Sequence, residues 1–227
     1  FNWKNEAKGN AAVHCVIIGF ANFDTLKKVI FEYEEINSEP HSKIVRNINP
    51  FLVEGRDITV ENRKKPLCSV TEINYGSMPI DNGNLILTNE EKEAVLLIEP
   101  EIERYIRPYT GGFEFINNKE RWCIWLENYN PLILKNSSFL KKRINQNKIY
   151  RESSNREATK KLAKKPMLFG EIRQPSSSYI IIPKVSSETR RYIPIGVLSS
   201  KIITSGSALI IPTSSMYIFG VLTSLTH

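Results

Sequence analysis

The sequence contains few of the residues that form disulfides or bind metals. It has three cysteines and three histidines among 227 residues. Cys15, Cys68 and Cys123 show no Cys-x-x-Cys spacing, and the histidines lie far apart along the chain. We therefore expect reduced cysteines, as in a cytoplasmic protein, with neither a disulfide framework nor a zinc site.

Long apolar runs are also missing. The longest one falls far short of a membrane span, and the N-terminal segment does not have the layout of a signal peptide, so we expect no membrane partner. The chain begins with Phe1 instead of methionine and ends at His227, directly after a strongly apolar segment. We therefore expect it to be a piece of a longer protein.

The residue patterns of common enzymes are absent as well. The glycines form neither a Gly-x-Gly-x-x-Gly motif nor a Walker loop, and no Ser/His/Asp or Cys/His set is apparent. The acidic pairs fall on predicted helix or strand surfaces, where such pairs are ordinarily solvated. We therefore expect no catalytic residue, no metal and no cofactor in this chain.

Positive charge, in contrast, is present in excess and is concentrated in one segment. The formal net charge is +7. Residues 140–165 contain ten basic and two acidic residues, so this segment alone carries more net positive charge than the whole chain. Their few apolar positions predict a pair of amphipathic helices with a broad basic face. A solvated face and a polyanion-binding face both fit, and the concentration of charge favours the polyanion.

The spacing of apolar residues predicts an α+β fold, with mixed and antiparallel strands, short helices and the basic helices across one side. We expect a strand buried on both faces at residues 10–20 and a half-exposed strand at residues 28–34. A hairpin is predicted from GGFEFIN and ERWCIWL, in which both tryptophans belong to the core. After Pro166, strands are expected in the segments SSYIIIP, RRYIPIGVL, SALIIP and MYIFGVL.

Helices and turns are predicted from their end signals. Thr88 and Glu91 form a capping box for a helix that extends to about Leu97. EPEIERYIRPY gives a second short helix that Pro108 stops, and Asp-Asn-Gly at residues 81–83 is typical of a tight turn.

One connection between two strand-like runs is rich in hydroxyl groups and arginines. In IPKVSSETRRYIPIG, residues 182–196, the side chains of Ser186, Ser187, Arg190 and Arg191 offer donors that suit an anionic oxygen. A solvated hairpin tip, with Glu188 neutralising one arginine, has the same composition. Both interpretations stay open on composition alone.

Five long segments resemble a known protein family. They are FNWKNEAKGNAAVHCVIIGF, GSMPIDNGNLILTNEE, YIRPYTGGFEFINNKERWCIWL, YIIIPKVSSETRRYIPIGVL and YIFGVLTSLTH. Together, and in this order, they are similar to the target recognition region of MmeI-like (type IIG/IIL) DNA methyltransferases, which are bacterial restriction-modification enzymes. The similarity covers nearly the whole chain, and it is specific because five segments match.

The resemblance implies a domain organisation. Residues 1–23 would be the terminal strands of an upstream methyltransferase domain, which is a partner in cis, and residues 24–227 the DNA target recognition domain. The family's Asn-Pro-Pro-Tyr motif and S-adenosylmethionine loop would lie upstream, so this cofactor is expected in the parent enzyme only. FNW at residues 1–3 resembles an aromatic segment beside a flipped adenine, with a frayed terminus as the alternative.

The resemblance also implies double-stranded DNA as the partner, with two kinds of contact. The predicted phosphate-binding residues are Ser186, Ser187, Arg190, Arg191, Lys160 and Lys161. The predicted base-reading residues, which lie on loops that would enter the major groove, are Ser200, Lys201, Thr204, Ser205, Thr213, Ser214 and Ser215. Ordinary Ser/Thr turns are the alternative for each reader. A structural or protein-interaction fragment with a solvated basic helix is the alternative function.

Overall fold

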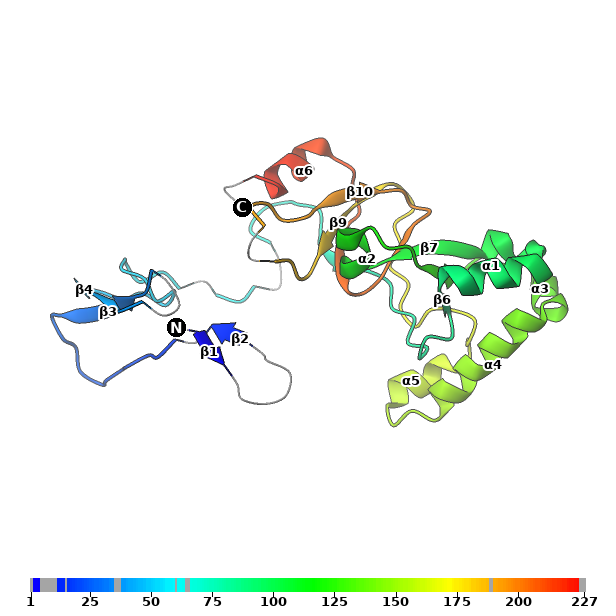
Figure 1. The fold of residues 1–227 in the computed structure, drawn as a ribbon, viewed down its shortest axis with the longest axis horizontal. Coiled ribbons are helices and arrows are strands. Elements are labelled where there is room, and N and C mark those ends of the chain that lie inside the picture. Colours follow the sequence, from blue (N-terminus) through cyan, green and yellow to red (C-terminus); the bar gives the residue numbers. More distant parts are fainter. Residues whose placement is uncertain are drawn as a thin grey trace. The chain divides into compact units, whose positions relative to one another are not determined.

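The computed structural model describes residues 2–4, 12–14, 16–34, 38–59, 61–63, 66–187 and 190–224, with residues 2–4 and 12–14 described by their backbone alone. The chain divides into two units, Phe1–Leu67 and Cys68–His227 (Figure 1). We describe each unit by itself. The predicted domain boundary after residue 23 is not tested by this division and stays a prediction.

The first unit contains two antiparallel pairs of strands. β1 (Asn2–Lys4) pairs with β2 (Ala12–His14), and β3 (Lys28–Glu32) pairs with β4 (His41–Val45). The half-exposed strand predicted at residues 28–34 is confirmed over residues 28–32, because Lys28 and Ile30 are partly buried whereas Val29 and Phe31 are exposed. A turn follows in which the Asn49 side chain accepts a hydrogen bond from the backbone N–H of Phe51 at 2.9 Å.

The prediction of a buried strand at residues 10–20 is wrong for residues 16–20. These residues form no strand, and Val16, Ile17 and Ile18 are exposed. A strand buried on both faces needs a layer on each side, and the described residues of this unit provide none there. Residues 10, 11 and 15 lie outside the described residues.

The second unit contains two four-stranded sheets. One has the order β10 (Gly196–Leu198), β9 (Tyr179–Pro183), β12 (Ala208–Ile211) and β5 (Asn74–Tyr75), and all of its pairs are antiparallel. The other has the order β11 (Ile203–Thr204), β7 (Ile106–Thr110), β8 (Trp122–Ile124) and β6 (Ile86–Leu87), with β11 parallel to β7. The α+β class with mixed and antiparallel strands is therefore confirmed.

The second unit also contains short helices. They are α1 (Asn89–Ile98), the 3-10 helix η1 (Pro100–Tyr105), α2 (Gly112–Asn117), α3 (Pro131–Asn136), α4 (Ser138–Glu152), α5 (Glu157–Leu162) and α6 (Met216–Leu222). The predicted capping box of α1 is confirmed, since Glu91 N–H donates to Thr88 Oγ1 at 3.2 Å and Thr88 N–H to the Glu91 carboxylate at 3.0 Å. The tight turn is confirmed by positive φ angles at Asn82 (51°) and Gly83 (81°).

Four predicted elements are wrong in type or extent. Of the strand predicted in RRYIPIGVL, only Gly196–Leu198 forms a strand. GGFEFIN forms helix α2 instead of a strand, because the Glu114 carboxylate accepts a hydrogen bond from Gly111 N–H at 2.9 Å and closes the first turn. MYIFGVL forms helix α6, whose first turn is capped by Ser215. The second short helix ends at Tyr105, and Pro108 lies within β7.

The core of the second unit lies around β7 and β8. Buried side chains from β6, η1, β8, α4 and β11 meet there, including Leu87, Ile102, Ile124, Leu140 and Ile203. Trp125 is 6% exposed and packs edge-on against Phe169, with 5.0 Å between the ring centres. Trp122 is partly buried against the same cluster, so the prediction that both tryptophans pack in the core is confirmed. Among the described residues, no helix has the length and apolarity to cross a membrane.

Candidate nucleic-acid interface

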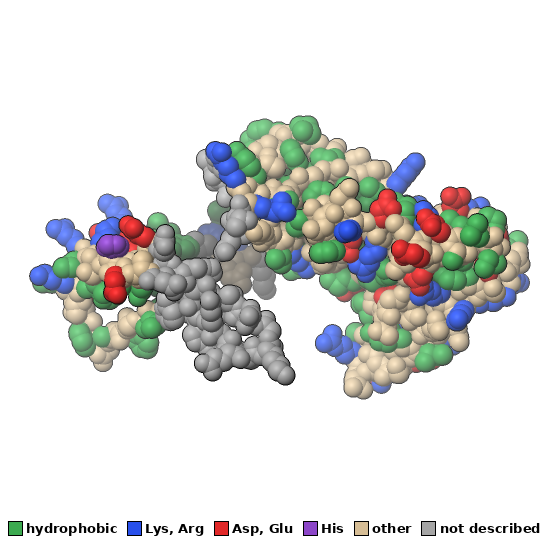
Figure 2. Space-filling model, in the orientation of Figure 1, with side chains coloured by type: hydrophobic (Ala, Val, Ile, Leu, Met, Phe, Trp, Pro, Cys, Tyr) green, Lys and Arg blue, Asp and Glu red, His purple; other side chains and the backbone are tan. Residues whose placement is uncertain are grey.

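The basic segment forms the helix pair α4 and α5, as predicted (Figure 1). Eight of its ten basic side chains are exposed: Lys141, Lys142, Lys148, Arg156, Lys160, Lys161, Lys164 and Lys165. Within α5, Lys160 forms an ion pair with Glu157 at 2.8 Å. Figure 2 shows acidic side chains interspersed with basic ones on the face it presents. Apart from Lys148 and Lys160, which pair with Glu152 and Glu157, these exposed cations are available to an anion, while the face drawn in Figure 2 is of mixed charge.

Two basic residues of this segment are not exposed. Arg143 is partly buried and forms an ion pair with Glu91 at 2.5 Å. Arg151 is only 1% exposed. Its guanidinium group donates hydrogen bonds to five backbone carbonyls, which belong to Pro79, Ile80, Leu162, Lys165 and Leu168. Burial lowers the pKa of Arg151 from its ordinary value. Arg151 therefore connects α4 to the end of α5 and to the 79–80 segment, and it is not part of the basic face.

The loop of residues 184–195 contains four of the predicted phosphate contacts. Ser186, Ser187, Arg190 and Arg191 are all exposed. The backbone N–H of Arg190 donates to the Ser187 carbonyl at 3.1 Å. Glu188 and Thr189 lie outside the described residues, so the proposed neutralisation of an arginine by Glu188 is not tested. The exposure of the four side chains is compatible with phosphate contacts, which stay a prediction.

The segment of residues 199–207 contains a second predicted group, and it is fixed by hydrogen bonds. Gln174 Nε2 donates to the carbonyls of Ser200 at 3.1 Å and Ile202 at 2.8 Å, and the Tyr179 hydroxyl donates to the Ile202 carbonyl at 2.7 Å. The Thr204 hydroxyl lies 2.7 Å from the Tyr179 hydroxyl. Lys201 is exposed at the tip of this segment.

Thr204 and Ser205 are placed differently from Lys201. Thr204 is 0% and Ser205 7% exposed, and both hydroxyls bond within the fold. A base edge would reach them only if the segment opened. Their base-reading role is untested, but this placement favours a structural role.

Residues 213–215 follow β12 directly. Thr213 Oγ1 accepts a hydrogen bond from Ser215 N–H at 3.2 Å, and Ser215 Oγ accepts one from Ile218 N–H at 3.5 Å, which caps α6. Ser214 is exposed. Thr213 and Ser215 therefore shape the turn, and Ser214 is the side chain of this group that faces solvent.

Strand register places the predicted groups at two ends of one sheet. β9 pairs Tyr179 with Leu198 of β10 and Ile180 with Ile211 of β12, so residues 199–202 and 212–215 both emerge at the Tyr179 end. The 184–195 loop joins β9 to β10 at the Pro183 end. The five residues of β9 separate the two ends by about 13 Å.

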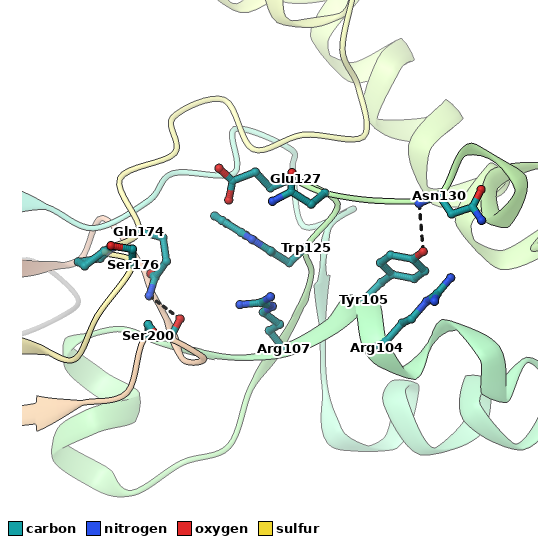
Figure 3. A pocket seen from close by; sticks show the side chains of 11 residues that line it. Arg104, Tyr105, Arg107, Trp125, Glu127, Asn130, Gln174, Ser176 and Ser200 are labelled. Carbon is teal, nitrogen blue, oxygen red and sulfur yellow. Dashed lines mark hydrogen bonds between the residues drawn. The ribbon is translucent and has the colours of Figure 1, made fainter.

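A cavity of about 590 Å³ lies next to the 199–207 segment. It is lined by Arg104, Tyr105, Arg107, Trp125, Glu127, Asn128, Asn130, Gln174, Pro175, Ser176 and Ser200. In Figure 3 the Arg107 side chain points into this cavity toward Ser200, while Tyr105 accepts a hydrogen bond from Asn130 N–H at 3.2 Å. Sequence reasoning missed Arg104, Arg107 and Gln174, because no local pattern distinguishes them.

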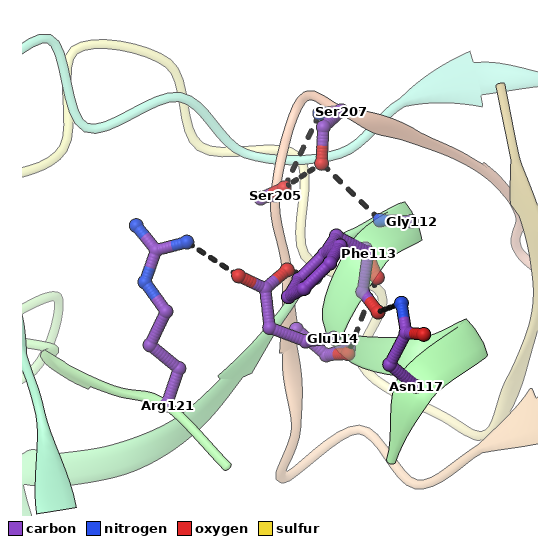
Figure 4. A network of polar contacts seen from close by, with 9 residues as sticks. Gly112, Phe113, Glu114, Asn117, Arg121, Ser205 and Ser207 are labelled. Atoms are coloured by element: carbon purple, nitrogen blue, oxygen red, sulfur yellow. Dashed lines mark hydrogen bonds and ion pairs between the residues drawn. The ribbon is translucent and has the colours of Figure 1, made fainter. Parts of the chain in front are cut away.

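A second network of polar contacts supports the turn at residues 205–207 (Figure 4). The Glu114 carboxylate accepts hydrogen bonds from Arg121 at 2.6 Å and from Gly111 N–H at 2.9 Å, while Gly112 N–H donates to Ser207 Oγ at 3.2 Å. Burial alone would raise the pKa of the Glu114 carboxyl, but the hydrogen bonds from Arg121 and the backbone outweigh it and hold that pKa below its usual value.

Titratable groups in the described part of the chain do not form a metal site, since no three His, Cys, Asp or Glu side chains gather there. Burial raises the pKa of Tyr109 and of the Cys123 thiol, so both remain neutral in the core. Cys68 and Cys123 are free thiols, and Cys15 lies outside the described residues. The absence of catalytic residues, metals and cofactors stays a prediction.

Comparison with known proteins adds three findings. Residues 54–227 match the family described as MmeI, target recognition domain. DNA methyltransferase A of Bacillus subtilis (strain 168) is 36% identical over 228 residues, which covers 100% of this chain and 25% of that protein. A solved structure of the type IIL restriction-modification enzyme MmeI in complex with DNA matches 100% of this chain and 30% of that one, with 42% identity and a TM-score of 0.91.

Proposed function

Because the chain belongs to the MmeI target recognition domain family, we propose that it binds double-stranded DNA sequence-specifically. It does so as the target recognition region of an S-adenosylmethionine-dependent adenine DNA methyltransferase. The parent protein is a cytoplasmic bacterial restriction-modification enzyme. In this proposal residues 1–23 complete the upstream catalytic domain, which binds the cofactor, and the chain itself performs no chemistry.

One observation carries the proposal beyond family membership: residues 141–165, which include α4 and α5, contain eight exposed cations. Lysine and arginine side chains that neutralise phosphates release counterions, and this release drives association with any duplex. It supplies affinity but carries no sequence information, so a second set of side chains must contact base edges. The exposed Lys201 and Ser214, at one end of the β9 sheet, are the best-placed candidates for that second task.

The alternative function is a structural or protein-interaction fragment whose basic helices face solvent. The two functions differ in their dependence on salt. If about six to ten phosphates are neutralised, affinity for a duplex should fall by about three to five orders of magnitude between about 50 and 200 mM salt. An affinity that does not change with salt, or no affinity for any duplex, would contradict the proposed function.

The proposed lack of catalysis has its own test. The purified 227-residue chain, incubated with duplex DNA and labelled S-adenosylmethionine, should transfer no methyl group. Turnover by this chain would show that it contains catalytic residues that the patterns above do not reveal.

A further inference from the structure

We propose that the cavity lined by β7, residues 125–130 and residues 174–176 binds a phosphodiester of the DNA backbone, with Arg107 and Arg104 as the contacting residues. The inference rests on the proposed function and deepens it. It adds two phosphate contacts outside the basic helices and the 184–195 loop. It also places them beside the segment that carries Lys201.

Arg107 is positioned by the sheet. It lies in β7 opposite Cys123 of β8, between the buried Ile106 and the partly buried Pro108. Its own side chain is partly buried and points into the cavity (Figure 3). The guanidinium group makes no hydrogen bond or ion pair with any residue that the structure describes. A partly buried cation without an anionic partner destabilises the fold. An anion that enters the cavity would therefore meet a positive charge that is already in position to bind it.

Arg104 lies on a second side of the same cavity. It is exposed, and its guanidinium carbon is 4.8 Å from the centre of the Tyr105 ring. Two guanidinium groups match the bidentate geometry of phosphate oxygens, and the amide and hydroxyl groups of Asn128, Asn130 and Ser176 add uncharged hydrogen-bonding partners. The lining therefore suits a singly charged phosphodiester.

Glu127 is the one acidic residue in the lining. In the view of Figure 3, Trp125 lies between Glu127 and Arg107. Within the described part of the chain, Glu127 forms no ion pair with either arginine. The two arginines thus outnumber the carboxylate, and the cavity carries a net positive charge.

A base is a poorer ligand than a phosphate for this cavity. Trp125 packs against Phe169 and is 6% exposed, so it offers no free ring face for stacking. Readout of base edges requires side chains that protrude into a groove, whereas these arginines lie in a concave site. Ser200 lines the cavity, and Gln174 binds the Ser200 carbonyl. A phosphate held here would therefore fix the position of Lys201 along the duplex.

The test uses the full-length parent enzyme and the duplex that it methylates. Single phosphates of that duplex are replaced by neutral methylphosphonates, and affinity is measured for wild type, Arg107→Gln and Arg104→Gln. For wild type, a methylphosphonate at one or two positions of the duplex should weaken binding about tenfold. The same replacements should not weaken the binding of Arg107→Gln further, because this variant has already lost the contact. Each variant should also lower the salt slope by about one unit while sequence preference persists.

Controls separate this proposal from other causes. Arg56→Gln removes an exposed arginine of the first unit, and its methylphosphonate profile should be that of wild type. Arg107→Lys keeps the charge and should retain the salt slope. Because Arg104 is exposed, Arg104→Gln remains informative if Arg107→Gln lowers the melting temperature.

Two results would overturn the inference. In the first, wild type binds its duplex specifically, yet both glutamine variants keep wild-type affinity, salt slope and methylphosphonate profile. In the second, millimolar inorganic phosphate stabilises wild type but not Arg107→Gln while no methylphosphonate couples to Arg107, which would identify a free anion as the ligand. If wild type shows no specific duplex binding at all, the proposed function itself fails.

Discussion

The 184–195 loop and the 199–207 segment have similar compositions but are held in different ways. Both combine serines with basic and apolar residues. The 199–207 segment receives hydrogen bonds from Gln174, Tyr179 and Gly112, whereas Arg190 and Arg191 of the 184–195 loop extend into solvent. The difference shows that distant partners, rather than composition, decide which polar segment has a fixed geometry.

This difference corresponds to two tasks in DNA recognition. A phosphate contact is sequence-independent and tolerates adjustment of a long arginine side chain. Base readout depends on the position of each donor and acceptor, so it needs a segment that is already in place. We therefore associate the 184–195 loop with phosphate binding and the fixed end of the sheet with base readout.

The largest expected effect is at Gly76, where the chain passes closely behind the 199–207 segment. A Cβ atom at this position would lie 2.3 Å from the Ser205 carbonyl oxygen and 2.5 Å from that of Thr204. Because both neighbours are backbone atoms, Gly76→Ala should destabilise the second unit by about 3 kcal/mol. Thermal unfolding measures this loss. Gly220→Ala, which has nothing within 4 Å of its Cβ, should leave stability unchanged or slightly raised.

A smaller effect is expected from Gln174→Ala. This change removes two hydrogen bonds to the Ser200 and Ile202 carbonyls and the acceptor for Thr204 N–H at 3.4 Å, which corresponds to about 2 kcal/mol. Amide hydrogen exchange should accelerate within residues 199–204 and stay unchanged in the 184–195 loop. Gln146→Ala, at an exposed position of α4, is the matched control. Equal acceleration in both segments would remove the distinction between them.

The smallest effect is the pH dependence supplied by Glu114. Its folded-state pKa lies below the unfolded value of about 4.3, so its contribution is present above that pH and is lost as pH falls through the folded value. Glu114→Gln should cost about 1 kcal/mol at neutral pH, because Arg121 is partly exposed, and should flatten the acid side of the stability curve. Denaturant unfolding between neutral pH and pH 3 checks this. A variant that keeps the wild-type acid slope would exclude Glu114 as its source.

Local signals in the sequence predicted part of the fold correctly. The capping box at Thr88, the turn at residues 81–83 and the basic helix pair each depend on residues close together in the chain. The strand predictions for GGFEFIN and MYIFGVL failed because a short apolar run fits both the helical and the strand period. In each segment one capping interaction favours the helix. The buried strand at residues 16–20 failed because burial depends on neighbouring layers, which the sequence of one segment does not contain.

The candidate site was predictable to a similar extent. Exposure of the 184–195 arginines and of the α5 lysines agrees with a composition that favours solvent or an anion. The burial of Arg151 and Thr204 was not predictable, because their partners come from segments far away in the chain. The same reason explains why Arg107, which faces a cavity built from four separate segments, had no signal in the sequence.

The most direct measurement of the central claim is the affinity of the full-length enzyme for its recognised duplex and for a scrambled one, at several salt concentrations. Arg190→Ala should weaken binding to both duplexes by a similar factor and lower the salt slope by about one unit, with sequence preference retained. Ser214→Ala should change the preferred base pair at one position by about 1 to 3 kcal/mol, with little effect on the salt slope. A change of sequence preference in Arg190→Ala, together with a uniform loss of affinity in Ser214→Ala, would contradict the assignment of the two ends of the sheet.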